Sequence, residues 1–450
     1  MSDGAPMMYH GSGYGGAPPV FMVAGQGERR PGALEYLQYV GAAPAPASPR
    51  RPPSPRRAQH PRHRDATAFG YESDDSSLSS NASGSNKSSD KGENVPNPGV
   101  SREWRGRRQP PRRRIAPERL LHASYPFQVK FTPDDLLNGS KWDTLSQEIW
   151  DKFVKSQQTE ETFRKKMNLW RYLYITIKSI FPRYGLYVVG STMSGFALDS
   201  SDMDLCLFVR GRAGGGRDHA LLHLAALHHY VRAIDPGAEL IQAKVPILKF
   251  GDARHGLQVD LNCNNVVGIR NTNLLHCYSR LDWRVRPLVV VTKLWAAAHN
   301  INDARQRTLS SYSLTLMVIH FLQCGVSPPV LPLVPPRGWD SPRAPRPASR
   351  ASLAELFLLL LRYYAHFPYD KMAVSVRCGA AVPVAQCRAA PRGDPAQWKL
   401  LCVEEPFDLT NTARSVYDPE TFARIVDTFR ASYLRLAGGL RLRDAWPEPR

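Results

Sequence analysis

A glycine-serine pair followed by two closely spaced aspartates constrains this chain more than any other feature. Gly190 and Ser191 end a β-rich run, and Asp202 and Asp204 come shortly afterwards in DMDLCLFV (202–209). Alternate side chains of a strand point to the same face, so the two carboxylates should project together. Two carboxylates so close repel each other unless a cation lies between them, and oxygen ligands suit Mg²⁺ or Mn²⁺. The spacing therefore predicts a divalent metal site.

A third carboxylate supports this interpretation. Asp260 stands among apolar residues in LQVDLNC (257–263), which predicts a second strand. Burying an unpaired carboxylate there would be costly, so we expect Asp260 to join the same metal site. Gly190 lets the backbone approach a phosphate, which the Ser191 hydroxyl and nearby N–H groups can bind. An isolated Asp-x-Asp is more often an ordinary exposed strand edge, but the Gly-Ser pair and Asp260 favour the metal site.

The first part of the chain differs from the rest in composition. Residues 1–120 are rich in Gly, Pro, Ser and Arg and predict a disordered region, because such segments bury too little apolar surface to offset chain entropy. Their densest basic run, RGRRQPPRRR (105–114), is a solvated linker, an RNA-contacting arm or a nuclear-import signal. The whole chain carries a formal charge of +19, which suits a polyanion, nucleic acid first and an anionic membrane surface second.

The remainder predicts two domains. Alternating and helical patterns give a mixed α/β domain over 125–280, whose leading helix is free to pack on the next domain. A mainly helical domain follows over 281–436, with a Pro-rich mobile loop at 327–348 and a tail at 437–450.

Several classes of protein are disfavoured. We see no run of roughly 18 apolar residues and expect no transmembrane helix, and the N-terminus lacks the pattern of a secretory signal. The seven cysteines are scattered, odd in number and without a C-x-x-C pair, which indicates reduced thiols in a cytosolic or nuclear protein without a zinc site. The histidines of 219–229 read as part of an ordinary helix.

These motifs resemble the DNA polymerase β-like nucleotidyltransferase superfamily, whose pattern is a glycine-serine pair, a pair of alternating acids and a third acid on a later strand. Several further stretches are similar to the germline-development (GLD) type of cytoplasmic poly(A) polymerase, a terminal RNA nucleotidyltransferase. They are IRNTNLL (269–275), RVRPLVVVTKLWA (284–296), INDARQRTLSSYSL (301–314) and VEEPFDLTNTAR (403–414). The resemblance covers about 125–435 and implies an α+β fold, with a polymerase β-like domain and a helical poly(A)-polymerase-associated domain.

The resemblance also implies a reaction. The RNA 3′-hydroxyl attacks the α-phosphorus of ATP and expels pyrophosphate, without a template and with two Mg²⁺ (or Mn²⁺) ions. By resemblance, Asp202 and Asp204 would hold both ions, and Asp260 would hold the ion at the nucleophile. The products would be polyadenylated cytoplasmic mRNAs or small RNAs with one added adenylate.

The resemblance also implies nucleotide-binding roles for individual residues. Ser191 would touch the β,γ-phosphates, while Asn265 and Thr272 would hold the ribose. Lys293 would neutralise the triphosphate, unless it is a lysine whose stem lies along the surface. Ser311, at a predicted helix start, suits phosphate.

The base site is implied by four positions. Tyr312 would stack on the base, unless it is only a core residue, and Glu405 and Asp408 would line the base edge. Uridylyl-adding relatives tend to carry a histidine three residues past the position of Asp408, where this chain has Asn411. The smaller side chain leaves room for a purine and predicts ATP over UTP.

Alternatives and departures remain. A terminal uridylyltransferase uses the same chemistry, and an inactive RNA-protein scaffold would keep the fold without the reaction. Ala297 replaces a second triphosphate-binding lysine of some relatives, and Met203 stands where relatives often have a small residue.

No RNA-recognition module appears in the sequence, so RNA binding should be weak and salt-dependent. We therefore expect a sequence-specific RNA-binding protein to recruit this chain to RNA 3′ ends in the cytoplasm, with the nucleus as a further location.

Overall fold

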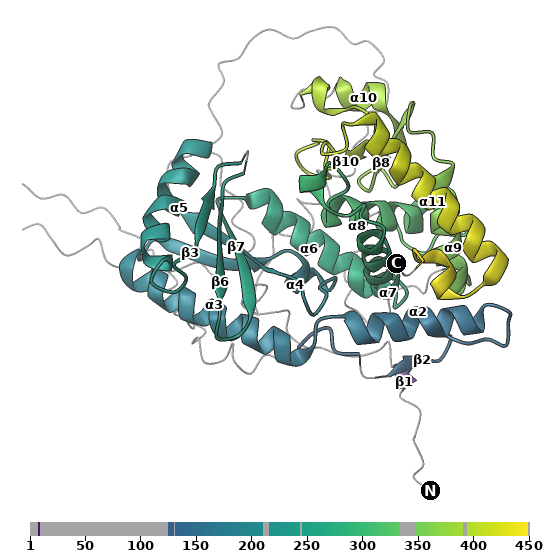
Figure 1. The fold of residues 1–450 in the computed structure, drawn as a ribbon, viewed down its shortest axis with the longest axis horizontal. Helices are drawn as coiled ribbons and strands as arrows, with labels where there is room; N and C mark the ends of the chain where they lie inside the picture. The colour runs from purple at the N-terminus through teal and green to yellow at the C-terminus, as the bar shows by residue number, and fades with distance from the viewer. Residues whose placement is uncertain are drawn as a thin grey trace, which may run out of the picture.

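The structure is a computed structural model that describes strand β1 (Met8–Tyr9) and residues 125–129, 131–209, 216–243, 245–333, 348–389 and 394–448. The disorder and the basic arm predicted for 1–120 therefore lie outside the described residues, apart from β1, and so does most of the Pro-rich loop. Figure 1 shows two parts side by side, a sheet with helices α3 and α5 and a group of helices that includes α7, α8, α9 and α11. Helix α6 lies between them (Figure 1).

A five-stranded mixed sheet organises the first part. Its order is β3-β4-β7-β6-β5, with β4 and β7 parallel and the other pairs antiparallel. The strands are β3 (Tyr184–Val189), β4 (Met203–Val209), β5 (Glu239–Ile241), β6 (Ile247–Asp252) and β7 (Leu257–Cys263). The sequence patterns predicted β3, β4 and β7 but neither β5 nor β6, although β6 pairs with β7 along its whole length.

Strand alternation divides the sheet into an apolar face and a polar one. Leu205, Val259 and Leu261 belong to a core that the sheet shares with α3 (Glu160–Ile180) and α5 (Arg217–Val231). The intervening residues, among them Asp204 and Asp260, lie on the opposite face, because successive side chains of a strand alternate. The sheet therefore turns its acidic face away from its two large helices.

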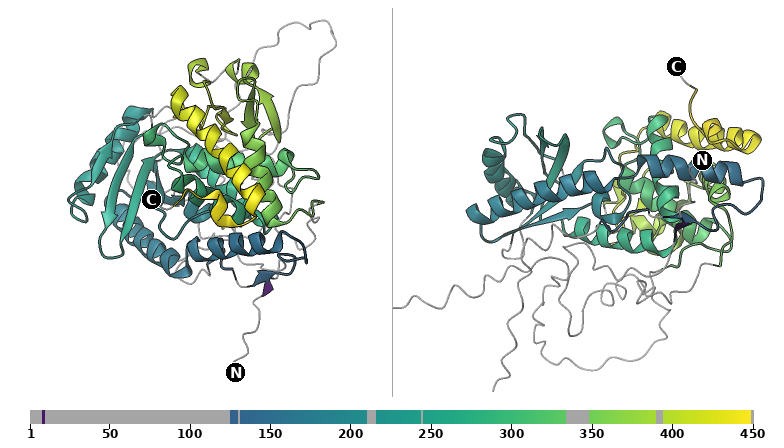
Figure 2. Two further views of the ribbon diagram at one scale, coloured as in Figure 1. Left: turned by 45° about the vertical axis from the view of Figure 1, so that its right-hand side comes forward. Right: turned by 90° about the horizontal axis from the view of Figure 1, so that it is seen from below.

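The second part is a helical bundle around its own core. Its members are α7 (Val285–Ala298), α8 (Ser311–His320), α9 (Leu353–Ala365) and α11 (Pro419–Gly439), and a π-helical turn, η4 (Phe321–Gly325), extends α8. Helix α2 (Asp143–Ser156) precedes the sheet in sequence, yet its buried Ile149 and Phe153 belong to the core of the bundle. In Figures 1 and 2, α2 lies along this part of the molecule. Helix α6 (Val266–Leu281) connects the two parts.

Two features of the bundle differ from expectation. It contains a small sheet of order β10-β8-β9, formed by β8 (Met372–Ser375), β9 (Ala380–Pro383) and β10 (Val403–Glu404). In the segment predicted as a tail from residue 437, α11 continues to Gly439 and a 3₁₀ turn, η6 (Leu442–Ala445), follows. Arg441 pairs with Glu148 of α2 at 2.6 Å, and Ala445 is fully buried.

The α+β fold class is confirmed. No helix of the described segments is long and apolar enough to cross a membrane.

Candidate active site

The pairing of β4 with β7 places two of the three predicted aspartates side by side. Asp204 and Asp260 are register partners in the parallel pair, and Asp202 directly precedes β4. The Asp202 side chain is 45% exposed and that of Asp260 is 26% exposed. Burial, followed by the charges of Asp260 and Asp202, raises the pKa of Asp204 to about 7. The structure thus gathers the three carboxylates on one face, where they repel one another.

A lysine absent from the sequence-based predictions lies between two of these carboxylates. Lys249 stands on β6 directly opposite Asp260 in the antiparallel pair. Its Nζ donates to Asp260 Oδ1 at 3.0 Å and to Asp202 Oδ2 at 3.1 Å. Burial alone would lower the pKa of Lys249, but its bonds to Asp260 and Asp202 outweigh burial and raise it. The alternation in ILKFGD (247–252) could have revealed this strand and its polar face.

The carboxylates are suitable ligands for a divalent cation. Carboxylate oxygens are the donors that Mg²⁺ and Mn²⁺ prefer, and the Lys249 ammonium shows that a cation fits between Asp202 and Asp260. Within the described ranges, however, no three His, Cys, Asp or Glu side chains converge closely enough to form a coordination shell. The residues fit the ion, but the carboxylates have to draw together to hold it.

The turn after β3 explains the glycine of the Gly-Ser pair. Gly190 has φ +71°, a left-handed conformation, and a Cβ there would overlap the Asp204 carboxylate. The Gly190 N–H donates to Thr272 Oγ1 at 2.9 Å, and the Thr272 hydroxyl donates to the Gly268 carbonyl at 2.7 Å. Thr272 was predicted to hold the ribose, but its only hydroxyl hydrogen is committed here, and it fastens the turn to α6. Ser191 begins the short helix α4 (Ser191–Ser194) beside Asp204.

Helix α7 holds the segment that runs from this turn toward Asp202. Lys293 Nζ donates to the Phe196 carbonyl at 3.0 Å, and Arg286 Nε donates to the Gly195 carbonyl at 3.0 Å. Lys293 is 7% exposed, so it is not a surface lysine. Burial lowers its pKa to about 8, against the effect of Asp204. The predicted triphosphate lysine thus lies near the aspartates, with a backbone carbonyl as its partner.

A second buried lysine supports the same segment from α3. Lys166 is 0% exposed, and its Nζ donates to Gln158 Oε1 at 2.9 Å and to Thr192 Oγ1 at 3.4 Å. Burial lowers its pKa to about 8, although Asp204 and other nearby aspartates act in the opposite direction. The sequence-based predictions missed Lys166. Its position on the apolar face of a predicted helix was the available signal.

Two further predicted residues lie at helix starts. Asn265 precedes α6, and its side-chain oxygen caps the helix by accepting from Gly268 N at 3.2 Å. Ser311 is the first residue of α8 and is exposed, and its hydroxyl donates to Asn302 Oδ1 at 3.1 Å. Asn265 therefore has a structural task as an N-cap, while Ser311 remains accessible to a ligand.

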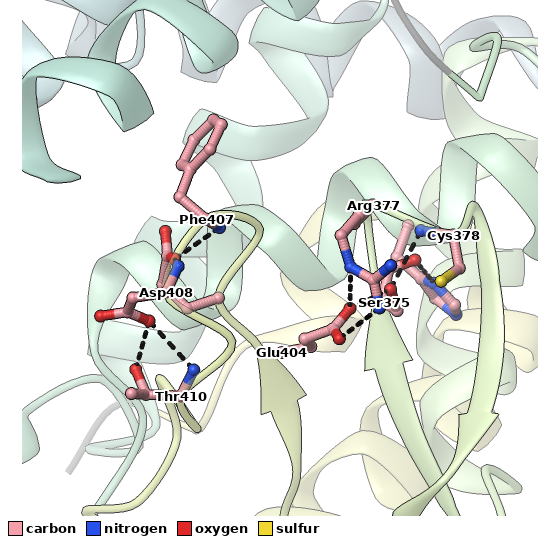
Figure 3. A network of polar contacts seen from close by, with 9 residues as sticks. Ser375, Arg377, Cys378, Glu404, Phe407, Asp408 and Thr410 are labelled. Carbon is pink, nitrogen blue, oxygen red and sulfur yellow. Dashed lines mark hydrogen bonds and ion pairs between the residues drawn. The ribbon is translucent and has the colours of Figure 1, made fainter. Parts of the chain in front are cut away.

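The predicted base-binding residues meet at α8 and the loop after β10. The Tyr312 hydroxyl donates to Glu405 Oε1 at 3.1 Å. Glu405 also accepts the N–H groups of Phe407 and Asp408, at 2.6 and 2.5 Å, and burial raises its pKa to about 7. Figure 3 shows Asp408 turned toward Thr410, which donates to it from both N and Oγ1, while the Phe407 ring points away from this pair.

The loop is anchored on the small sheet by an ion pair between the partly buried Arg377 and the buried Glu404. Arg377 Nη2 lies 2.6 Å from Glu404 Oε1, and its Nε lies 3.2 Å from Oε2 (Figure 3). Ser375 of β8 also donates to Glu404, at 2.5 Å. Since Glu404 directly precedes Glu405, this ion pair helps to position Glu405, one of the residues predicted to line the edge of the base. No sequence motif indicated the pairing of Arg377 with Glu404.

The structure does not support the role predicted for Asn411. The side chain is 1% exposed. Its oxygen accepts from the N–H groups of Val403 and Ala413, and its Nδ2 donates to the carbonyls of Gln397 and Leu401. All four of its hydrogen-bonding positions are occupied by backbone groups. Asn411 therefore shapes its loop, and the expectation that its small size leaves room for a purine stays a prediction.

Comparisons with known proteins agree with this architecture. Residues 145–280 match the family described as "Poly(A) RNA polymerase, mitochondrial-like, central palm domain", and residues 352–411 match "Cid1 family poly A polymerase". The chain is 48% identical over 339 residues to Poly(A) RNA polymerase gld-2 homolog A of Drosophila melanogaster, a match that covers 70% of this chain and 25% of that protein. It is 40% identical over 331 residues to Poly(A) RNA polymerase GLD2 of Mus musculus, which covers 68% of this chain and 67% of that protein.

Solved structures show the same fold. The GLD-2/RNP-8 complex matches with a TM-score of 0.59 and 39% identity, over 68% of this chain and 98% of that chain. A crystal structure of the Cid1 poly(U) polymerase matches with a TM-score of 0.58 and 25% identity, over 66% and 95% of the two chains. The chain spans about a quarter of the length of the Drosophila relative and about two thirds of the mouse relative.

Proposed function

Because this chain belongs to the GLD-2 family of poly(A) RNA polymerases, we propose that it transfers AMP from ATP to RNA 3′ ends without a template. The observation that carries the proposal is the pairing of Asp204 with Asp260 across β4 and β7, with the Gly190 turn packed against the Asp204 carboxylate. Carboxylates beside a turn that only glycine can form suit metal-assisted phosphoryl transfer.

In the proposed reaction Asp202, Asp204 and Asp260 hold two Mg²⁺ or Mn²⁺ ions. When bound, these ions favour ionisation of the attacking 3′-hydroxyl and neutralise the charge that develops on the leaving pyrophosphate. Ser191 binds the β,γ-phosphates from the turn, and the buried Lys293 contributes positive charge near them. Ser311, exposed at the start of α8, contacts phosphate from the bundle side. The nucleotide would then contact both parts of the molecule.

The proposed base site is formed by Tyr312, Glu405 and Asp408, with Asn265 and Thr272 beside the ribose. The Tyr312–Glu405 hydrogen bond holds the tyrosine ring against the loop, where the ring can stack on a base. We propose ATP as the substrate because relatives at 40–48% identity are named poly(A) polymerases. A terminal uridylyltransferase is the second candidate, favoured by solved structures at 25% identity that include the Cid1 poly(U) polymerase and a cytoplasmic RNA terminal U-transferase.

We further propose that an RNA-binding protein delivers the RNA. A solved relative is a GLD-2/RNP-8 complex, and a formal charge of +19 supports sequence-independent attraction to RNA. We propose that the chain acts in the cytoplasm, where polymerases of this type meet mature mRNA, with the nucleus as a second location.

Primer extension tests the proposal. The full chain is incubated with an unstructured RNA primer, Mg²⁺ or Mn²⁺, and each of the four nucleoside triphosphates separately. ATP should support extension, and Asp204→Asn should reduce it at least about a thousandfold, because carboxylates that act together in a site give large losses singly. Preferred use of UTP would favour the uridylyltransferase. Failure with every nucleotide, by protein that melts cooperatively, would indicate the inactive scaffold.

A further inference from the structure

Strand pairing places the Lys249 ammonium in the aspartate cluster. Lys249 is the register partner of Asp260 on β6, so its side chain emerges on the same face as the carboxylates. Its Nζ lies 3.0 Å from Asp260 Oδ1 and 3.1 Å from Asp202 Oδ2. The backbone pairing thus places the lysine on the same face as the carboxylates that it contacts.

Other cations near the cluster are held elsewhere. Lys293 Nζ donates to the carbonyl of Phe196, and Lys166 Nζ donates to the side chains of Gln158 and Thr192. Among the described residues, Lys249 is the lysine whose ion pairs with Asp202 and Asp260 are direct. An ammonium is a compact charge that neutralises two neighbouring carboxylates without forming a coordination shell. Asp202 and Asp260 therefore have a cationic partner in the fold itself.

We propose that Lys249 is a built-in counter-ion of the aspartate cluster, which a divalent metal has to displace before Asp202, Asp204 and Asp260 can converge on it. This inference rests on the proposed function, since it concerns the same three aspartates. Lys249 stabilises the cluster when no metal is bound, and it lowers the affinity of the cluster for a metal that arrives alone. A metal that arrives with a triphosphate has additional ligands and competes better for the carboxylates.

Metal affinity without nucleotide tests the inference directly. Mn²⁺ binding to the full chain is measured by electron paramagnetic resonance of the free ion, for wild type, Lys249→Met and Lys249→Arg. Lys249→Met should bind Mn²⁺ roughly three- to tenfold more tightly, the range expected when two partly exposed ion pairs no longer compete. Lys249→Arg keeps the charge and can pair bidentately with a carboxylate, so it should bind Mn²⁺ no more tightly than wild type.

Thermal unfolding gives an independent readout. In EDTA, Lys249→Met should melt below wild type, because Asp202 and Asp260 lose their counter-ion. In Mn²⁺ this deficit should shrink, because the bound ion takes over the same task. Lys165→Met is a matched control, since it removes a lysine from an exposed pair with Glu161 on α3, and it should change neither measurement.

The outcomes separate this inference from the proposed function. If wild type extends primers and binds Mn²⁺ but Lys249→Met binds the ion equally or more weakly, Lys249 is no competitor and the inference fails. It also fails if Lys249→Arg tightens binding as much as Lys249→Met, because charge would then be irrelevant. If wild type neither binds Mn²⁺ nor extends a primer with any nucleotide, the proposed function fails, and the inference fails with it.

Discussion

Lys293 Nζ lies 3.0 Å from the carbonyl oxygen of Phe196 and thereby joins helix α7 of the bundle to the segment between the Gly190 turn and Asp202. The side chain is buried, and burial lowers its pKa to about 8. A lysine predicted only as a ligand of the triphosphate is thus also a connection between the two parts of the molecule. A test of Lys293 therefore has to measure nucleotide binding and stability separately.

Lys293→Met should raise the KM for ATP by roughly tenfold, which corresponds to the loss of about 1.4 kcal/mol of charge-assisted binding. Its effect on stability should be small, because removing a buried charge offsets the loss of the bond to Phe196. Steady-state extension at varied ATP and thermal melting measure the two effects. An unchanged KM with a lowered melting temperature would contradict a role in nucleotide binding.

Gly190→Ala should abolish extension and destabilise the chain. The residue has φ +71°, and the added Cβ would overlap the Asp204 carboxylate. Gly139→Ala is a matched control, because Gly139 has φ +78° with nothing within 4 Å of an added Cβ. It should cost only the backbone strain, about 1–2 kcal/mol, and retain activity. Equal activities of the two variants would show that the Gly190–Asp204 contact is unimportant.

Asn411→His should reduce the use of ATP and UTP together. The Asn411 side chain bonds to four backbone groups, and leaving several of them unpaired costs roughly 2–4 kcal/mol. Relative kcat/KM for ATP and UTP, measured beside urea unfolding, distinguishes the possibilities. A stable variant with a selective gain in UTP use would instead support the sequence-based prediction that the small side chain at position 411 leaves room for a purine.

Lys166→Met should leave thermal stability unchanged or higher, because an apolar side chain of similar length replaces a fully buried cation. Activity should nevertheless fall roughly tenfold, about 1.4 kcal/mol, since a charge near Asp204 and a bond to Thr192 are lost. Lys165→Met, its exposed neighbour on α3, should keep wild-type activity. A Lys166→Met variant that is stable and fully active would show that the buried charge is dispensable.

Two buried histidines should contribute a loss of stability as the pH drops from about 6.5 to about 4, whereas the raised pKa values of Asp204 and Glu405 act in the opposite direction. Burial lowers the pKa of both His276 and His320 from 6.5 to about 4. In this window the unfolded chain binds protons that the folded chain does not, so unfolding is favoured as the pH decreases. Each histidine contributes at most about 1.4 kcal/mol per pH unit. Urea unfolding at pH 7.5, 6 and 5 measures the slope, and His320→Asn should reduce it. The same pH dependence in wild type and His320→Asn would contradict a neutral, buried His320 in the folded chain.

The sequence patterns predicted the strands β4 and β7 and most helices because their signals are local. Alternation marked 257–263, and helical spacing marked 161–181 and 286–299, within a residue of the observed ends. Strand β6 was missed because it follows a proline and contains a glycine, two residues that are typical of turns and that obscure its alternation. The small sheet of the bundle was missed because strands of two to four residues carry almost no periodicity.

For the site, the sequence by itself determined which carboxylates are available, because strand alternation places Asp202 and Asp204 on one face and the cost of burying Asp260 unpaired points to the same site. Their role as metal ligands stays a prediction. Only the tertiary structure decided that Lys249 lies between two of them, that Lys166 and Lys293 are buried beneath the Gly190–Asp202 segment, and that Asn411 bonds to its own loop. Those placements depend on strand register and on contacts between residues far apart in the chain, which no local pattern encodes.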